Sequence, residues 1–277
     1  MRNKSAGSWA RVSSAGERRG SFMAKTAIVT GGSRGIGRAI ALRLAQDGAR
    51  VVLCARDPAP LNATVADIER AHGRALAITA DLREPASADR LIHSALDAFG
   101  AIDIVVNNAG GTKRGEFEEL SEDDWADGFA LKFFGAVRVT RAAWPHLKKQ
   151  SGSVVNIAGI GGRTPGPDFA IGGSVNAALL SFTKALADVG IRDGIQVNAI
   201  NPGSVRTERL ARRLAVDAAK AGIDIEAAAH NLISSSNATR LGEPEDIANL
   251  VAFVLGPGGR FLQGSLIDID GGQTKTL

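Results

Sequence analysis

The segment TAIVTGGSRGIGRAIALRLAQDG (26–48) decides the fold of this chain. Its first five residues are a short apolar run rich in β-branched side chains, typical of a buried strand. Glycines at 31, 35 and 37 follow Thr30 at the spacing TGxxxGxG, and a helix is predicted from about Ile36 to Asp47. Glycine permits a tight turn and lets a phosphate approach the backbone N–H groups at a helix N-terminus. The segment therefore predicts a nucleotide site, although its spacing differs from the generic GxGxxG fingerprint.

The alternation of strand and helix continues along the rest of the chain. Strands are predicted at 26–30, 50–55, 74–80, 101–107, 152–158, 194–201 and 265–270, and helices at 36–47, 58–72, 84–99, 122–149, 173–190 and 244–255. Apolar strands separated by helices favour parallel pairing with both faces of the sheet covered. We predict a single-domain α/β protein, a doubly wound Rossmann fold whose seven-stranded parallel sheet has helices on both faces. Residues 208–240 are the longest excursion between a strand and its next helix, and are expected to form a lid over the ligand cleft.

The basic net charge of +4 lies in the N-terminal segment. Residues 1–22 hold five basic residues and one acidic residue, whereas the remainder holds 28 of each. This balance removes the support for nucleic acid as a partner. Residues 1–22 lack any strand or helix periodicity, so we expect an upstream extension before Met23, with a disordered arm or transit peptide as the alternatives. Residues 23–277 are then the Rossmann domain.

The counts of particular residue types exclude several kinds of site and of reaction. Cys54 is the single cysteine, which excludes an intramolecular disulfide and a cysteine metal cluster and favours the cytoplasm. The four histidines lack the spacing of a metal site, and no apolar run approaches the ~18 residues of a membrane helix. We therefore expect no metal and no membrane partner. The chain has no tyrosine, so a mechanism that needs a phenol from this chain is excluded.

Five ordered motifs carry a resemblance to a known family. They are TGxxxGxG (30–37), Asp81 after the third strand, NNAG (107–110), PGxxxT (202–207) and DGG (270–272). On these motifs the chain resembles the classical short-chain dehydrogenase/reductase (SDR) family from Ala24 to Gly272. The resemblance implies the Rossmann fold and a nicotinamide cofactor. It implies cofactor contacts from Gly31, Ser33, Arg34, Gly35, Ile36, Gly37, Arg56, Asp81, Leu82, Asn107, Asn108, Ala109, Gly110, Pro202, Gly203, Val205 and Thr207.

The choice of cofactor follows from charge at the end of the second strand. NAD enzymes of this kind place an acidic residue there to bind the ribose 2′-hydroxyl. This chain has Ala55 at that position, followed by Arg56, and a second cation, Arg34, lies in the glycine-rich turn. Guanidinium groups bind a 2′-phosphate well. We expect NADP(H) in preference to NAD(H), the alternative being two solvated surface arginines.

The resemblance also shows which catalytic residues are missing. The family uses Asn, Ser, Tyr and Lys, with Tyr as the general acid/base. Counting from local landmarks places these four positions at Lys132, Gly159, Gly172 and Asn176, respectively. All four positions differ from the family. A positioned proton donor contributes about 10²–10⁴ in rate, so the ordinary mechanism is not open to this chain alone.

Two of these positions have exchanged residue types. Where the family has Asn and Lys, this chain has Lys132 and Asn176, so one ammonium and one amide would meet in the same relay. A buried lysine can become a usable acid or base. We therefore name Lys132, Asn176 and the nearby Asp168 as candidate catalytic residues, with chance substitution as the alternative. Other polar residues near the expected cleft are better explained as solvated loop side chains: Lys113, Arg114, His230, Ser234, Ser235 and Ser236.

These observations support more than one function. The first hypothesis is an NADP(H)-dependent oxidoreductase that acts on a carbonyl or alcohol substrate through an atypical proton relay. The alternative is a catalytically inactive SDR homologue, an NADP-binding regulatory or structural partner of an active paralogue. Nothing singles out a third possibility, a lyase or isomerase. The resemblance further implies a homodimer or homotetramer, or a hetero-oligomer with an active paralogue.

Overall fold

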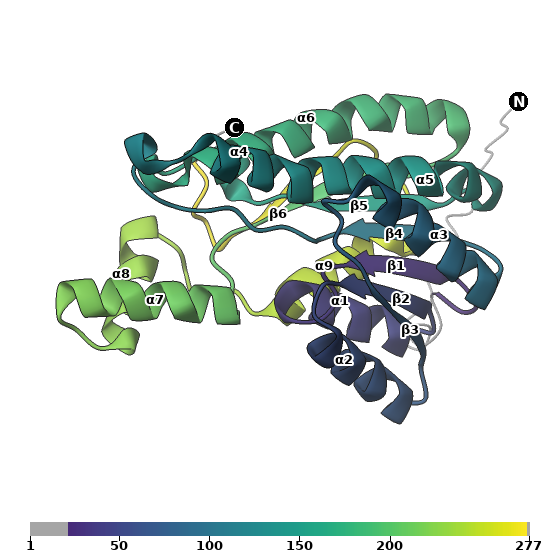
Figure 1. Ribbon diagram of the computed structural model, residues 1–277, viewed down its shortest axis with the longest axis horizontal. Helices are drawn as coiled ribbons and strands as arrows, with labels where there is room; N and C mark the ends of the chain where they lie inside the picture. Colours follow the sequence, from purple (N-terminus) through teal and green to yellow (C-terminus); the bar gives the residue numbers. More distant parts are fainter. Residues whose placement is uncertain (1–21, 276–277) are drawn as a thin grey trace, which may run out of the picture.

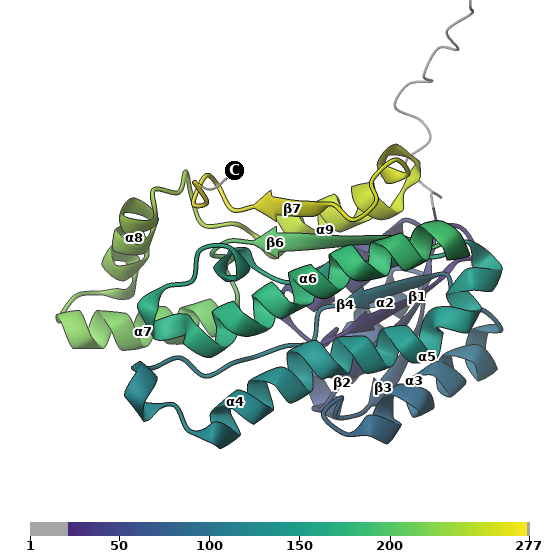
Figure 2. The same cartoon turned by 90° about the horizontal axis from the view of Figure 1, so that it is seen from above.

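The computed structural model describes residues 22–275, and a seven-stranded parallel sheet is its central layer (Figures 1 and 2). The strands are β1 (Thr26–Thr30), β2 (Arg50–Ala55), β3 (Arg74–Thr79), β4 (Ile104–Asn107), β5 (Ser153–Ile157), β6 (Gln196–Pro202) and β7 (Leu266–Ile269). Their order is β3-β2-β1-β4-β5-β6-β7, which confirms the predicted doubly wound fold. The direction of winding reverses between β1 and β4, and this is where such folds bind their ligands.

Helices cover both faces of the sheet, as predicted. They are α1 (Gly35–Gln46), α2 (Pro58–Arg70), α3 (Pro85–Phe99), α4 (Glu122–Gly128), α5 (Gly135–Gln150), α6 (Ala170–Asp193), α7 (Glu208–Ala221), α8 (Ile225–Ser236) and α9 (Pro244–Leu255). Buried side chains of α1, α2 and α9 form one core with the sheet, and those of α3 and α5 form most of the other. Strands buried on both faces account for their nearly unbroken apolar sequences.

Several predicted boundaries were wrong by a few residues, most clearly at 101–107. Only Ile104–Asn107 pairs as a strand, because the Asp103 carboxylate accepts a hydrogen bond from the Thr26 backbone N–H at 2.8 Å. The predicted helix 173–190 begins earlier, at Ala170, and ends later, at Asp193. It is long and apolar enough to cross a membrane, yet it packs along β6 and contributes to the core.

The predicted continuous helix 122–149 is interrupted. A π-helical turn, η2 (Phe129–Phe134), separates α4 from α5. Periodicity does not reveal such a turn because six residues are too few to show a pattern of their own. π-Helical turns are frequent at functional sites, and this one contains Lys132.

The segment 208–240 forms a helix pair, α7 and α8, at the end of the molecule toward which β6 and β7 point (Figure 2). The two helices pack on each other through an apolar cluster of their own, which includes Leu210, Leu214 and Ala229. They therefore stand at the carboxyl ends of the strands, the position expected of a lid.

The domain boundary predicted before Met23 needs correction. Phe22 is only 1% exposed and belongs to the main core, whereas Met23 is 71% exposed. The Phe22 backbone N–H also donates to the Asp47 carbonyl at 3.1 Å. Phe22 is thus part of the folded domain, and residues 1–21 of the predicted tail lie outside the described residues.

Candidate active site

The glycine-rich turn between β1 and α1 leads into a helix N-terminus without a side-chain cap. Gly31 and Gly35 adopt positive φ angles of 66° and 53°, which favour glycine. Arg34, the N-cap of α1, makes no capping hydrogen bond, and the first turn of the helix holds no acidic residue. A Cβ on Gly37 would lie 2.2 Å from the Gly31 carbonyl oxygen, so only glycine lets the helix sit this close. The turn therefore fits a diphosphate held by the helix N-terminus.

The NNAG motif after β4 fixes this turn. The Asn108 amide donates to the carbonyl oxygens of Thr30 and Gly31 at 3.0 and 3.2 Å. The Thr30 hydroxyl accepts hydrogen bonds from the backbone N–H groups of Asn108 and Ala109, both at 3.0 Å. Asn107 is buried, and its amide donates within the core to Thr140 and Asn156. Asn107 is thus a structural residue in this arrangement, and Asn108 shapes the turn.

The PGxxxT segment reaches the same place from β6. A Cβ on Gly35 would lie 3.2 Å from the Thr207 side chain, so the two loops are in contact. The Thr207 hydroxyl caps α7 by accepting from the Leu210 N–H at 3.3 Å. Three motifs that are far apart in the sequence thus surround one cleft. The cofactor contacts of Ser33, Ile36, Leu82, Gly203 and the other residues assigned by resemblance remain predictions.

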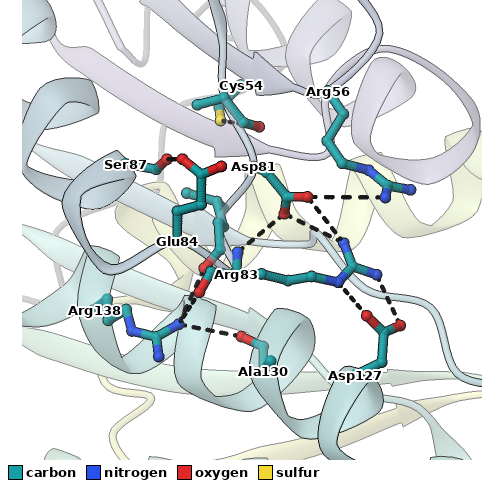
Figure 3. A network of polar contacts seen from close by, with 11 residues as sticks. Cys54, Arg56, Asp81, Arg83, Glu84, Ser87, Asp127, Ala130 and Arg138 are labelled. Atoms are coloured by element: carbon teal, nitrogen blue, oxygen red, sulfur yellow. Dashed lines mark hydrogen bonds and ion pairs between the residues drawn. The ribbon is translucent and has the colours of Figure 1, made fainter. Parts of the chain in front are cut away.

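The two arginines assigned to the 2′-phosphate both have carboxylate partners. Arg34 pairs with Asp57 at 3.3 Å and, across the cleft, with Glu208 of α7 at 3.1 Å. Arg56 lies 4.0 Å from Asp81, which also pairs with Arg83 (Figure 3). These pairs are exposed, and a guanidinium has five N–H donors, so both arginines keep donors for an anion.

The predicted exchange at positions 132 and 176 brings the two side chains into direct contact. The Lys132 ammonium donates to the Asn176 amide oxygen at 2.6 Å and to the Ala158 carbonyl at 2.5 Å. Asn176 is buried and Lys132 is partly buried. Desolvation, and to a smaller extent the charge of Arg209, lower the pKa of Lys132 from 10.5 to about 7. Lys132 can therefore exchange a proton near neutral pH.

The positions of the missing Ser and Tyr are closed to larger side chains. Gly159 has φ +135°, and a Cβ there would lie 3.1 Å from the Asn176 amide nitrogen. A Cβ on Gly172 would lie 2.1 Å from two ring carbons of Phe169. The same ring would be 2.7 Å from a Cβ on Gly161. The Phe169 ring therefore lies over these two glycines and takes the space next to the position of the family's phenol.

Asp168 is held by a different partner. Both of its carboxylate oxygens accept from the Arg114 guanidinium at 2.9 Å, and that guanidinium lies 4.0 Å above the centre of the Phe169 ring. The pair secures the loop that carries Phe169. The structure shows no contact between Asp168 and Lys132, and a catalytic role for Asp168 stays a prediction.

The remaining polar residues near the cleft have local partners or face solvent. Lys113 pairs with Asp124 at 2.8 Å, and His230 is exposed on α8. The hydroxyls of Ser235 and Ser236 donate to backbone carbonyls of their own helix. Within residues 22–275 there is no group of three or more His, Cys, Asp or Glu side chains that could hold a metal ion.

Two features of the site were missed from sequence. Arg209 touches the candidate catalytic region through Gly110, which is distant along the chain, whereas Phe169 does so through Gly161 and Gly172 of its own part of the chain. A signal for Phe169 was available in its position three residues before Gly172, because a glycine can accommodate an adjacent ring.

Comparison with known proteins agrees with this geometry. The family model for short chain dehydrogenases matches residues 25–218. An uncharacterized oxidoreductase of Mycobacterium tuberculosis is 39% identical over 252 residues, which cover 90% of this chain and 92% of that protein. The structure of L-sorbose reductase from Gluconobacter frateurii, complexed with NADPH and L-sorbose, is similar with a TM-score of 0.89 at 31% identity, covering 94% of this chain and all of that one. A Burkholderia cenocepacia short chain dehydrogenase in complex with NADP has a TM-score of 0.81 at 35% identity, covering 91% and 98% of the two chains.

Proposed function

Because this chain belongs to the short-chain dehydrogenase family of nicotinamide-dependent oxidoreductases, we propose that it is an NADP(H)-dependent reductase of carbonyl compounds in which Lys132 replaces the tyrosine. The observation that carries the proposal is the contact of the Lys132 ammonium with Asn176 and Ala158. These two acceptors hold a proton donor at the relay positions of the family, beside a cleft that fits the cofactor.

The proposed chemistry needs one proton donor and one hydride donor. The reduced nicotinamide, when bound, supplies the hydride to the carbonyl carbon. Lys132 gives a proton from its ammonium to the carbonyl oxygen, which yields the alcohol and a neutral amine. Asn176 and Ala158 orient the ammonium by accepting its other hydrogens, and solvent returns the proton. In the reverse direction the neutral amine takes the proton from the alcohol.

The preference for NADP(H) rests on the charge around the expected ribose site. Arg34 and Arg56 both lie there, and the end of β2 carries Ala55 in place of an acidic residue. The relatives with bound cofactor named above contain NADPH or NADP, which supports the same choice. A 2′-phosphate would displace Asp57 or Glu208 from Arg34, and the contact with Glu208 would link the cofactor to the proposed lid.

Cofactor binding and a carbonyl screen test this function together. We expect NADPH to bind more tightly than NADH, and the native chain to oxidise NADPH in the presence of at least one carbonyl compound. The comparison variant is the triple change Phe169→Ala, Gly172→Tyr, Asn176→Lys, since the tyrosine needs the space of the Phe169 ring. Turnover by the variant alone would show that the native site is inactive, and would contradict the proposal.

One observation favours a second function, a non-catalytic NADP-binding partner of an active paralogue. The Phe169 ring fills space beside the position of the family's phenol. The glycines at 159 and 172 supply no hydroxyl group in place of the family's serine and tyrosine. The exposed Phe134 and the ring contact of Phe133 with Phe182 at 6.0 Å lie on the helices through which family members commonly assemble. Co-purification with a tyrosine-containing homologue would support this function, and a homotetramer that turns over NADPH would exclude it.

A further inference from the structure

We infer that Arg209 and Lys132 form an anion-recognition pair, and that the substrate is an oxo acid whose carboxylate binds Arg209 while its carbonyl oxygen faces Lys132. The inference deepens the proposed function and rests on it for the reduction step. Its experiments include a binding measurement that does not require turnover.

The stem of Lys132 and the guanidinium of Arg209 both lie against one residue, Gly110. A Cβ on Gly110 would lie 2.8 Å from Cδ and 2.9 Å from Cγ of Lys132, so the lysine stem crosses this glycine directly. The Arg209 guanidinium donates to the Gly110 carbonyl oxygen, and a Cβ on Gly111 would be 3.5 Å from it. The glycines after β4 thus leave room for two cations from different helical segments, η2 and α7.

No carboxylate neutralises either cation within the described part of the chain. Ion pairs engage Arg206 and Arg213, but within residues 22–275 none involves Arg209 or Lys132. Arg209 is exposed as a residue, and partial desolvation of its guanidinium, together with the charge of Arg212, lowers the pKa of Arg209. Like charges held together without a counter-ion favour binding of an anion.

The hydrogen-bond donors that Lys132 and Arg209 have left suit two different parts of a ligand. Lys132 already places two of its three donors on Asn176 and Ala158, which leaves one proton for a single oxygen. Arg209 uses one donor on Gly110 and keeps four, enough for a two-point contact with a carboxylate. A carbonyl oxygen at Lys132 and a carboxylate at Arg209 therefore match the free donors, and such a molecule is an oxo acid.

The cofactor diphosphate is the other anion that Arg209 could meet. It is expected at the N-terminus of α1, which has no side-chain cap. Arg209 instead contacts Gly110 and acts on the charge of Lys132, on the side of the candidate relay. These contacts favour the substrate carboxylate as the anion that binds Arg209. A measurement of cofactor affinity distinguishes it from the cofactor diphosphate.

The test compares acids with their neutral esters. Pyruvate, acetoacetate and levulinate, each beside its methyl ester, are assayed as NADPH-dependent substrates of the native chain and of Arg209→Gln, Arg209→Lys and Arg213→Gln. We expect one of the acids to be reduced with at least about tenfold higher kcat/KM than its ester. Arg209→Gln should raise the KM for that acid roughly 10- to 100-fold and leave the ester unchanged. Arg209→Lys should recover part of the loss, and Arg213→Gln, which removes an ion-paired arginine of the same helix, should behave as the native chain.

Three results would overturn the inference. If acids and esters are reduced equally well and Arg209→Gln has no effect, the proposed anion site is contradicted and the proposed function still stands. A loss of NADPH affinity in Arg209→Gln without a change in the KM for acids would assign Arg209 to the cofactor. If no carbonyl compound is reduced, the proposed function fails. Isothermal titration calorimetry then tests the anion site by itself, by comparing the binding of oxamate and methyl oxamate to the complex of the protein with NADP⁺. Oxamate binding that Arg209→Gln abolishes supports the anion pair, and no oxamate binding up to about 10 mM refutes it.

Discussion

The low pKa of Lys132 predicts a pH dependence that an ordinary lysine would not produce. Desolvation, aided by Arg209, lowers this pKa from 10.5 to about 7. Carbonyl reduction needs the charged ammonium, so its rate should be constant below pH ~7 and fall about tenfold per pH unit above it. Alcohol oxidation needs the neutral amine, so its rate should rise up to the same pH and then level off. A lysine with the usual pKa would show neither transition.

The same shift predicts how stability depends on pH. One pKa unit corresponds to about 1.36 kcal/mol, so the fall from 10.5 to about 7 gives an upper value of about 5 kcal/mol for the cost of the charged form in the fold. Between these two pH values the unfolded chain binds more protons at Lys132 than the folded chain does. The free energy of unfolding of the native chain should therefore rise with pH in this interval, relative to Lys132→Met, by at most about 1.4 kcal/mol per unit.

The assay combines three chains and two measurements. The native chain, Lys132→Met and the control Lys149→Met, an exposed lysine at the end of α5, are compared from pH 5.5 to pH 9.5 (about four units) by steady-state kinetics and urea unfolding. We expect Lys132→Met to lose about 10²–10⁴ in kcat and to bind NADPH as the native chain does. Lysine Cε NMR of the native chain and Lys132→Met identifies the titration of Lys132 directly. A titration near 10.5, or full activity of Lys132→Met, would refute the reasoning.

The cofactor cleft gives three further tests. Arg34→Ala and Arg56→Ala should each raise the Kd for NADPH about tenfold and hardly change that for NADH in fluorescence titrations, whereas equal losses would contradict a 2′-phosphate contact. Gly37→Ala places a methyl group 2.2 Å from a backbone carbonyl and should lower the free energy of unfolding by about 2–4 kcal/mol, while Gly115→Ala, with its nearest neighbour at 3.7 Å, should change it by less than about 0.5 kcal/mol. Gly159→Ser forces a side chain onto φ +135° and should cost about 1–3 kcal/mol in thermal unfolding, with no gain in turnover; an unchanged melting temperature would contradict this strain.

The sequence predicts the sheet well because strand and helix periods are local properties. The order of the strands is the one expected of the doubly wound Rossmann fold, which was predicted from the alternation of strands and helices. The meeting of Lys132 with Asn176 was predicted from the exchange of residue types at family positions, and the structure joins them at 2.6 Å. What periodicity could not give is the π-helical turn that carries Lys132, since six residues are too few to show a pattern of their own.

The contacts that modify the site connect residues far apart in the chain. Arg209 reaches Gly110 from 99 positions away, and Arg34 reaches Glu208 from 174 positions away. In the sequence, Arg209 is indistinguishable from a residue on the charged face of a solvated helix, and the pairing of Arg34 with Glu208 leaves no local signal. The Phe169 ring fills the space beside Gly172, where the sequence shows only that a side chain is missing. The position of the ring depends on a loop that has no periodic pattern. Asp168 was predicted to replace the phenol because it lies near Gly172 in the sequence. Its partner Arg114 lies 54 residues earlier, so the sequence gives no local signal of their pairing.

The energetic cost of Lys132 distinguishes the two proposed functions. An ammonium that is partly buried beside another cation, with two neutral acceptors and no carboxylate, destabilises its charged form, as the low pKa of Lys132 records. A chain that only binds NADP gains nothing from this arrangement, and a methionine of similar length would fill the same space without the cost. If Lys132→Met gains stability at low pH and loses turnover, the charge serves proton transfer; if it gains stability and loses nothing, the non-catalytic function is the better account of the site.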